Sequence, residues 1–293
     1  MTTIERPAGS DNALQRPPAP GALDDHSSVR RPSLWRRYTR SRALGWTLVL
    51  ALLAGWQVSS LIEYVPTISS PALILETLVT DLVGADRAGG DLLWALLDTL
   101  RTMSIGFVIA VPLGIGLGFL MGRVRVIWAL LEPLVEIIRL HPTTAILPIL
   151  ILFLGLGDPM KITAFLITAI FPLLMTAYAG ARSVSPTLKE TAQTFQLSWW
   201  RTQWEIALPS SVPYILVGVR QALGSSLLMA VVVGMLSGNS GIGFYILEAQ
   251  QSLNIRSLLA GVVTVAAVGY VFNSIFLAAE KRFTRWRKTD MAP

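Results

Sequence analysis

Long apolar runs with almost no charge constrain this sequence more than any other feature. The run from Leu44 to Ile62, as an α-helix, would extend about 28 Å and nearly cross a hydrocarbon core of about 30 Å. The chain is 53% hydrophobic and 14% charged, whereas a soluble domain is about 25% charged. The sequence therefore predicts an all-α integral membrane protein.

Six such runs are expected to be transmembrane helices. They cover residues 44–62, 96–121, 127–156, 162–180, 212–236 and 258–279. Arginines cluster before the first run, and Lys281, Arg282 and Arg285 follow the last. Because cytoplasmic segments carry the excess of Lys and Arg, this pattern places both the N-terminus and the C-terminus in the cytoplasm.

Four regions follow from these runs. They are a disordered Pro/Arg-rich cytoplasmic tail (1–43), a first transmembrane helix with an outer amphipathic segment (44–95), a five-helix core containing a cytoplasmic loop at 182–210 (96–281), and a basic cytoplasmic tail (282–293). Ser70-Pro71 is expected to open the amphipathic helix. The basic residues adjoin apolar runs, which favours orientation in the membrane and contact with lipid over nucleic-acid binding.

Small residues recur every four positions in the second run. They are Gly106, Ala110, Gly114, Gly118 and Gly122. Such a stripe lets another helix backbone approach closely, which is how helices associate in lipid. The partner is either a helix of the same subunit or a second copy of the chain. Pro112 in this run predicts a kink.

The third run combines charges with prolines. Glu136 and Arg139 are three residues apart and can form an ion pair. Pro142 and Pro148 predict a broken helix, which at membrane depth is tolerated only against protein or a water-filled cavity. The charges lie either at the cytoplasmic interface or along a translocation pathway. Asp158 and Lys161, which follow, are expected in a short outer loop.

A polar, tryptophan-rich segment from Ser185 to Pro209 separates the fourth and fifth runs. Its apolar residues Leu188, Ala192, Phe195 and Trp199 have spacings of four, three and four, which predicts that they share one helical face. A helix with an apolar face and no obvious partner in its own chain favours docking on another protein.

Motifs of a self-contained enzyme are absent from the sequence. There is no Gly-Lys pair of a phosphate-binding loop, no His-Glu-x-x-His and no Gly-x-Ser-x-Gly. The segment Gly238 to Gly243 looks like a phosphate loop, but it follows a membrane run and is interpreted as a turn. The chain has no cysteine and only two histidines, His26 and His141, so no metal site is predicted.

Glu190-Thr-Ala192, followed by Ile206-Ala-Leu-Pro209, resembles the EAA loop of permease subunits of binding-protein-dependent ABC importers. The resemblance extends from Thr99 to Arg287 and is greatest to the sulfonate/taurine/nitrate type. Further matching pieces include Thr99-Leu-Arg101, Arg139-x-x-Pro142, Phe153-Leu-Gly-Leu-Gly157, Gly218-x-Arg220 and Asn239-Ser-Gly-Ile-Gly243.

The resemblance implies a MetI-like permease core of six transmembrane helices in the bacterial inner membrane. It implies a homodimer, an extracytoplasmic solute-binding protein, and a pair of ATPase subunits that bind ATP and Mg²⁺, so this chain itself binds no cofactor and is not an enzyme. Its loop would seat a coupling helix on the ATPase through Glu190, Ala192, Phe195, Leu208 and Pro209, to which the apolar stripe adds Trp199. Solute would pass along surfaces from the third and fifth spans.

Three positions depart from the family pattern. Gln196 stands where the loop motif has glycine, so the turn lacks glycine's freedom at positive φ, and the helix can instead continue through it. Leu227 and Gly234 stand where sulfonate-type permeases have Trp and Glu in the fifth span. These two positions join Arg139 and Pro142 as candidates for the translocation pathway, and they leave the solute open.

Two other classes of protein remain as alternatives. A self-sufficient secondary transporter would show internal repeats and a charged midplane site, and no convincing repeat is present. A membrane-anchored scaffold would have dispensable spans. ATP-independent flux that an uncoupler abolishes would favour the secondary transporter, and flux that requires an ATPase partner would favour the importer.

Overall fold

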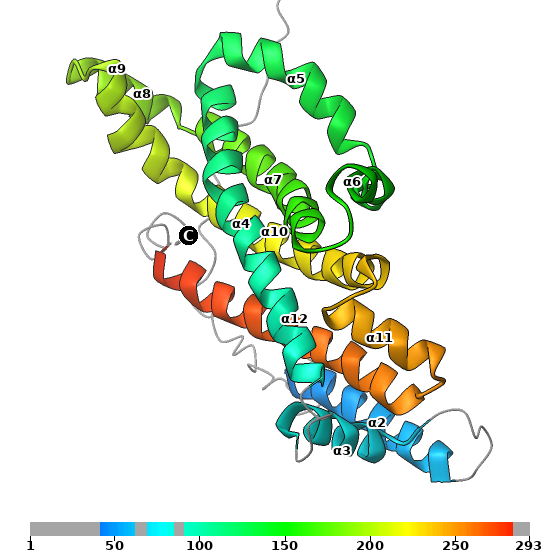
Figure 1. Ribbon diagram of the computed structural model, residues 1–293. Helices are drawn as coiled ribbons and strands as arrows, with labels where there is room; N and C mark the ends of the chain where they lie inside the picture. Colours follow the sequence, from blue (N-terminus) through cyan, green and yellow to red (C-terminus); the bar gives the residue numbers. More distant parts are fainter. Residues whose placement is uncertain (1–41, 62–68, 85–90, 284–293) are drawn as a thin grey trace, which may run out of the picture. The chain divides into compact units, whose positions relative to one another are not determined.

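The computed structural model describes residues 42–61, 69–84 and 91–283, and over these residues it contains helices and no strands (Figure 1). The elements are α2 (Arg42–Leu61), α3 (Pro71–Val83), α4 (Asp91–Arg123), α5 (Arg125–Arg139), the 3₁₀ helix η1 (Thr143–Ile146), α6 (Leu147–Leu154), α7 (Asp158–Arg182), α8 (Pro186–Thr194), α9 (Trp199–Arg201), the π-helical turn η2 (Thr202–Ala207), α10 (Leu208–Ser237), α11 (Ile242–Gln251) and α12 (Ile255–Phe283). Contacts divide the chain into two units, 1–54 and 55–293, and all packing described below lies within the second.

Four of the described helical segments are long and apolar enough to cross a membrane. They are Asp91–Arg123, Asp158–Arg182, Trp199–Ser237 and Ile255–Glu280, and the bent pair formed by α5 with residues 143–154 makes a fifth if it is one span. α2 occupies the expected first span as a helix of 20 residues. The all-helical membrane fold is thus confirmed, while six spans and cytoplasmic termini stay predictions. Of the two predicted tails, only residues 42–43 and 282–283 are described, at the ends of α2 and α12, and the rest lies outside the described residues.

The break predicted in the third span is confirmed. α5 ends at Arg139, residues 143–154 resume the helical path at an angle of 89°, and Pro148 lies in the first turn of α6. Pro142 between them disfavours the helical conformation at the preceding residue, which ends α5 there. The predicted ion pair also forms, with Arg139 Nη2 2.7 Å from Glu136 Oε2.

The small-residue stripe of α4 is covered by α7 of the same chain. At each of its four glycines an added Cβ would lie within 3 Å of an α7 atom, and at Gly118 it would lie 2.2 Å from the carbonyl oxygen of Leu174. Ala110 between them is fully buried. The backbones of α4 and α7 are therefore in direct contact, and this face of α4 is not available to a second copy. α4 continues through Pro112 as one helix.

The prediction that Asp158 and Lys161 form an outer loop is wrong. α7 begins at Asp158, because Gly155 and Gly157 at positive φ reverse the chain and Pro159 occupies the first turn of the helix. Lys161 therefore lies inside α7, where its side chain is only 3% exposed.

Candidate functional site

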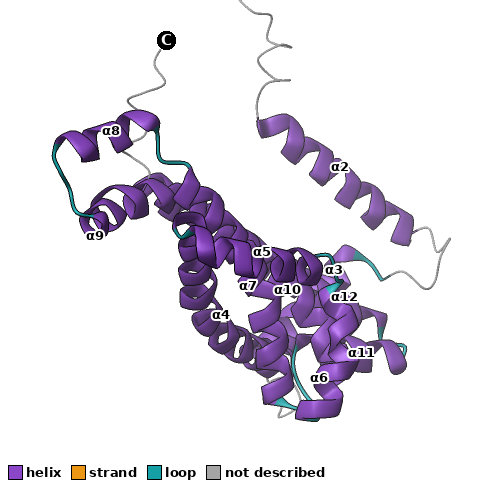
Figure 2. Cartoon of the chain, turned by 90° about the horizontal axis from the view of Figure 1, so that it is seen from above, coloured by secondary structure: helices purple, strands orange, loops and turns teal. Residues whose placement is uncertain are grey.

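Residues 183–209, here called the coupling segment after the role that the family resemblance implies, run from the end of α7 to the first two residues of α10, and α8 is their first helix. Ser185 caps the helix, its hydroxyl accepting a hydrogen bond from the amide of Leu188 at 3.3 Å, and Pro186 occupies the first helical position. Figure 2 shows α8 beside α9, joined by a short loop.

The loop after α8 turns at Gln196, which adopts a φ of 51°. The amide of Leu197 donates to the carbonyl of Ala192 and the amide of Gln196 donates to that of Gln193, each at 3.0 Å, which is the hydrogen-bond pattern of a Schellman cap. Gln196 thus adopts the turn conformation expected of glycine, and α8 ends before it. A left-handed conformation costs a residue with a Cβ about 1–2 kcal/mol.

The predicted single apolar face is consequently wrong. Trp199 begins a new helix beyond the turn at Gln196, so it does not continue the face of α8. Phe195 is 73% exposed, whereas Ala192 is covered by its own chain and only 4% exposed. Glu190 is exposed on α8.

Exposed tryptophans extend the aromatic surface beyond the residues that the spacing indicates. Trp200 and Trp204 are 68% and 66% exposed, and the Trp199 and Trp200 rings meet edge to face with centroids 4.6 Å apart. The closeness of Trp199, Trp200 and Trp204 in the sequence could have indicated this aromatic surface. The spacing of apolar residues on one helical face, however, selected only Trp199.

The chain is helical without a break from Trp199 to Ser237, through Leu208 and Pro209. Proline within a helix lacks an amide hydrogen and clashes with the carbonyl four residues earlier. The wider π-helical turn η2 ends at Ala207, two residues before Pro209, and so covers the residue four positions earlier, with whose carbonyl the proline ring would clash. Leu208 and Pro209 therefore lie at the junction between the coupling segment and the membrane span.

A partly buried polar clamp ties this junction to the rest of the core. Arg123, the last residue of α4, donates through Nε to Oε1 of Gln203 and through Nη1 to the carbonyl of Ala181 near the end of α7. Gln203 is 5% exposed and also donates to the carbonyl of Trp199 at 3.3 Å. The clamp joins α4, α7 and η2, and sequence reasoning missed it because its members are 58 and 80 residues apart.

A second polar cluster fastens the opposite ends of α4 and α7. Lys161 Nζ donates to Asp98 Oδ2 at 3.1 Å and to the carbonyl and hydroxyl oxygens of Ser240 at 3.0 and 2.6 Å, so all three of its hydrogens have acceptors. The amide of Ile242 donates to Thr99 Oγ1 at 2.8 Å. Hydrogen bonds therefore hold the glycine-rich loop at 238–241 to α4 and α7, in agreement with its interpretation as a turn.

At this same end, Tyr245 of α11 donates its phenolic hydrogen to Asp81 of α3 at 2.5 Å. Burial, together with this bond to the carboxylate, raises the pKa of Tyr245 above its ordinary value of 10.0. The neutral phenol is therefore the form that holds α11 to α3.

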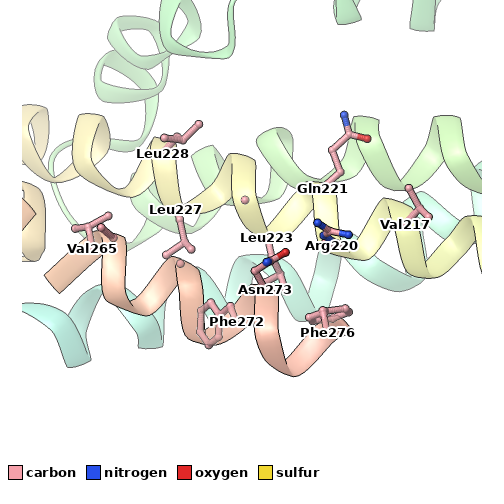
Figure 3. A pocket seen from close by; sticks show the side chains of 13 residues that line it. Val217, Arg220, Gln221, Leu223, Leu227, Leu228, Val265, Phe272, Asn273 and Phe276 are labelled. Carbon is pink, nitrogen blue, oxygen red and sulfur yellow. The ribbon is translucent and has the colours of Figure 1, made fainter. Parts of the chain in front are cut away.

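A cleft of about 540 Å³ separates α10 from α12 (Figure 3). Its lining is apolar apart from Arg220, Gln221 and Asn273. Figure 3 shows Leu227 on α10 pointing toward α12, which carries Phe272, and places Arg220 between Leu223 and Val217 along α10. No carboxylate forms an ion pair with Arg220 within the part of the chain that the structure describes.

The four candidate pathway residues do not come together. Leu227 lines the cleft, but Gly234 lies where α10 crosses α11, and an added Cβ there would be 2.7 Å from the amide nitrogen of Gly243. Arg139 and Pro142 lie at the bend between α5 and α6. No group of three or more metal-ligating side chains occurs among residues 42–61, 69–84 and 91–283.

Residues 110–285 match the family described as "Binding-protein-dependent transport system inner membrane component". The chain belongs to this family of ABC importer permeases. The permease is 31% identical over 232 residues to the nitrate import permease protein of Synechocystis, covering 77% of this chain and 83% of that protein. It is 29% identical over 242 residues to the taurine transport system permease protein of Escherichia coli, covering 82% and 88%.

Other curated relatives of the permease are named for aliphatic sulfonates and bicarbonate. A solved structure of the MetNI methionine ABC transporter shares its fold with a TM-score of 0.54 at 16% identity, covering 74% of this chain and all of that one. The resemblance to sulfonate/taurine/nitrate-type permeases is confirmed. The permease is a multi-pass membrane protein by its family and its apolar helices.

Proposed function

We propose that this permease is the transmembrane subunit of an ATP-driven importer in a bacterial inner membrane and that it carries a small solute of the sulfonate, taurine or nitrate class. The observation that carries the proposal is the coupling segment, which exposes an aromatic surface and whose Gln203 accepts a hydrogen bond from Arg123 at the end of α4. Arg123 in turn donates to the carbonyl of Ala181 in α7. Two copies of the chain form the pathway, a solute-binding protein delivers the solute, and separate ATPase subunits bind ATP and Mg²⁺.

Docking on the ATPase uses the outward residues of the coupling segment. Glu190 supplies a charge and Phe195 and Trp199 supply apolar surface, of the aromatic kind enriched at protein interfaces. Ala192 contributes differently, because its small buried side chain lets α8 lie close to its own chain.

Motion of the docked segment reaches the membrane core by two routes. The first is the unbroken helix that contains Leu208 and Pro209, and the second is the bond between Gln203 and Arg123. Because Arg123 also donates to the carbonyl of Ala181 near the end of α7, a shift of the coupling segment that preserves both hydrogen bonds moves α4 and α7 with it.

The proposed solute class is supported by Arg220, the one charged side chain among the described residues that line the α10–α12 cleft. The guanidinium of Arg220 has no carboxylate partner among the described residues, whereas Arg139 is neutralised by Glu136. Guanidinium groups bind planar or tetrahedral oxyanions through paired N–H donors. Leu227 and Phe272 supply apolar surface for an organic substituent.

The test is uptake by proteoliposomes that contain the permease, the ATPase subunit and the binding protein. Glu190→Lys should abolish most ATP-dependent uptake of taurine while insertion of the permease is unchanged. Glu76→Lys, an exposed charge reversal on α3, is the matched control and should leave uptake intact. Uptake by the permease alone that an uncoupler abolishes would refute the importer and support a secondary transporter.

The anion assignment is tested separately with Arg220→Gln. This variant should reduce uptake of taurine, sulfonates and nitrate while the complex still assembles with its ATPase. Unchanged uptake of all three would remove the α10–α12 cleft from the pathway, and the importer assignment itself would not depend on that outcome.

A further inference from the structure

A second hollow lies beside the clamp, away from the α10–α12 cleft. This groove, here called the Trp groove, has a volume of about 330 Å³. It is lined by Pro112, Ile115, Gly116, Phe119, Leu120, Arg123, Trp199, Trp200, Gln203, Trp204 and Leu208. One wall belongs to α4 and the other to the helix that begins at Trp199, and only two of the lining residues, Arg123 and Gln203, carry polar groups beyond the indoles.

The length of the Trp groove matches one leaflet of a bilayer. Its α4 wall runs from Pro112 to Arg123, a rise of eleven residues or about 16 Å, and half of a hydrocarbon core is about 15 Å. Both walls are segments able to cross a membrane. Leu120 on one wall is 43% exposed and Trp204 on the other 66%, so the groove opens away from the protein core.

The charge at one end of the Trp groove has no carboxylate partner among the described residues. Arg123 bonds to the side-chain oxygen of Gln203 and to the carbonyl of Ala181, and both acceptors are neutral. The ion pairs of the described residues do not include Arg123. Trp200 and Trp204 lie at the same end, and tryptophan is enriched where a membrane meets water.

We propose that the Trp groove binds an anionic phospholipid, with its phosphate beside Arg123 and an acyl chain along the apolar walls. An acyl chain is apolar, is about one leaflet long and needs no hydrogen-bond partner, which the groove walls do not supply. Basic pockets between transmembrane helices are known to bind anionic head groups. The lipid would contact both α4 and the coupling segment, and would stabilise the clamp that joins them.

Native mass spectrometry of the full-length permease, extracted in detergent and mixed with phosphatidylglycerol and phosphatidylcholine of identical chains, tests this proposal. The wild type should retain phosphatidylglycerol in preference. Arg123→Gln should lower that preference by about tenfold, as expected for loss of one charge-assisted interaction. No transport is measured, so the result is independent of the proposed function.

Gly116→Phe tests the groove without touching the clamp. An added Cβ at Gly116 has no atom within 4 Å, so the ring would enter the open groove and should displace the lipid. Gly55→Phe, at another open glycine in α2, is the matched control and should retain phosphatidylglycerol.

Equal retention of the two lipids by the wild type would overturn the proposal, because binding would then be annular only. Full phosphatidylglycerol retention by Gly116→Phe would also overturn it. A Gly116→Phe variant that keeps its lipid but loses dimerisation would assign the groove to a second copy of the chain.

Discussion

Gly118→Ala should destabilise the permease, although alanine ordinarily favours a helix. The new Cβ would lie 2.2 Å from the carbonyl oxygen of Leu174 and 2.9 Å from its Cα, both backbone atoms that cannot rotate away. Reaching an ordinary contact of about 3.4 Å requires α4 and α7 to separate locally by roughly 1 Å. A gap of that size forfeits a quarter to a half of each dispersion contact along the seam. We expect a loss of about 1–3 kcal/mol of unfolding free energy.

Gly116→Ala is the matched control because the same substitution, two residues away, meets open space. There the helix gains up to about 1 kcal/mol from the removal of glycine. Thermal unfolding of the two detergent-solubilised variants should therefore shift in opposite directions, by a few degrees per kcal/mol. Equal shifts of the two midpoints would refute the direct backbone contact between α4 and α7.

Three further predictions concern single polar groups. Lys161→Met should lower the free energy of unfolding, measured with a chemical denaturant, by about 3 kcal/mol, because Asp98 and Ser240 lose the cation that they surround. Adding Asp98→Asn to this variant should recover part of the loss. Gln196→Gly should raise thermal stability by about 1 kcal/mol while preserving coupled uptake, because glycine adopts the observed φ of 51° without steric cost. The free energy of unfolding, measured from pH 9 to 11, should fall above pH 10. The raised pKa of Tyr245 keeps its phenol protonated in the folded protein, whereas the phenol of the unfolded chain ionises. Tyr245→Phe should abolish this part of the pH dependence.

Each of these three has an outcome that would count against it. A Lys161→Met chain as stable as the wild type would show that the buried cation is dispensable. A lower midpoint for Gln196→Gly would contradict the left-handed turn. Identical pH profiles for the wild type and Tyr245→Phe would mean that the phenol does not hold α11 to α3.

The membrane helices and the start of α3 were predictable because each depends on neighbouring residues. The cap at Ser70 and the break around Pro142 express local backbone chemistry that a sequence displays directly. Buried polar ties were not predictable in this way. A charged residue next to an apolar run is expected in a loop, and only the structure shows that Lys161 donates to Asp98, 63 residues away.

The coupling segment shows both cases. The motif residues Glu190 and Pro209 were found by resemblance, and their positions at α8 and at the start of α10 agree with a loop between spans. The turn at Gln196 was missed because its intrinsic preference is helical, and the surrounding hydrogen bonds to Ala192 and Gln193 outweigh that preference. The predicted helical face was therefore continued from Phe195 to Trp199, although α8 ends before Gln196.

The unbroken helix from Trp199 to Ser237 would transmit movement from one end to the other if it tilts as a rigid body. At 1.5 Å per residue its 39 residues measure about 58 Å, nearly twice the thickness of a hydrocarbon core. A tilt of about 5° around its middle would displace each end by roughly 2.5 Å in opposite directions. One end carries the tryptophans and the other leads directly into the loop in which Ser240 holds Lys161. In such a rigid-body tilt, a displacement of the tryptophans would strain the hydrogen bonds of Lys161 at the other end of the helix, with no residue between having to change its conformation.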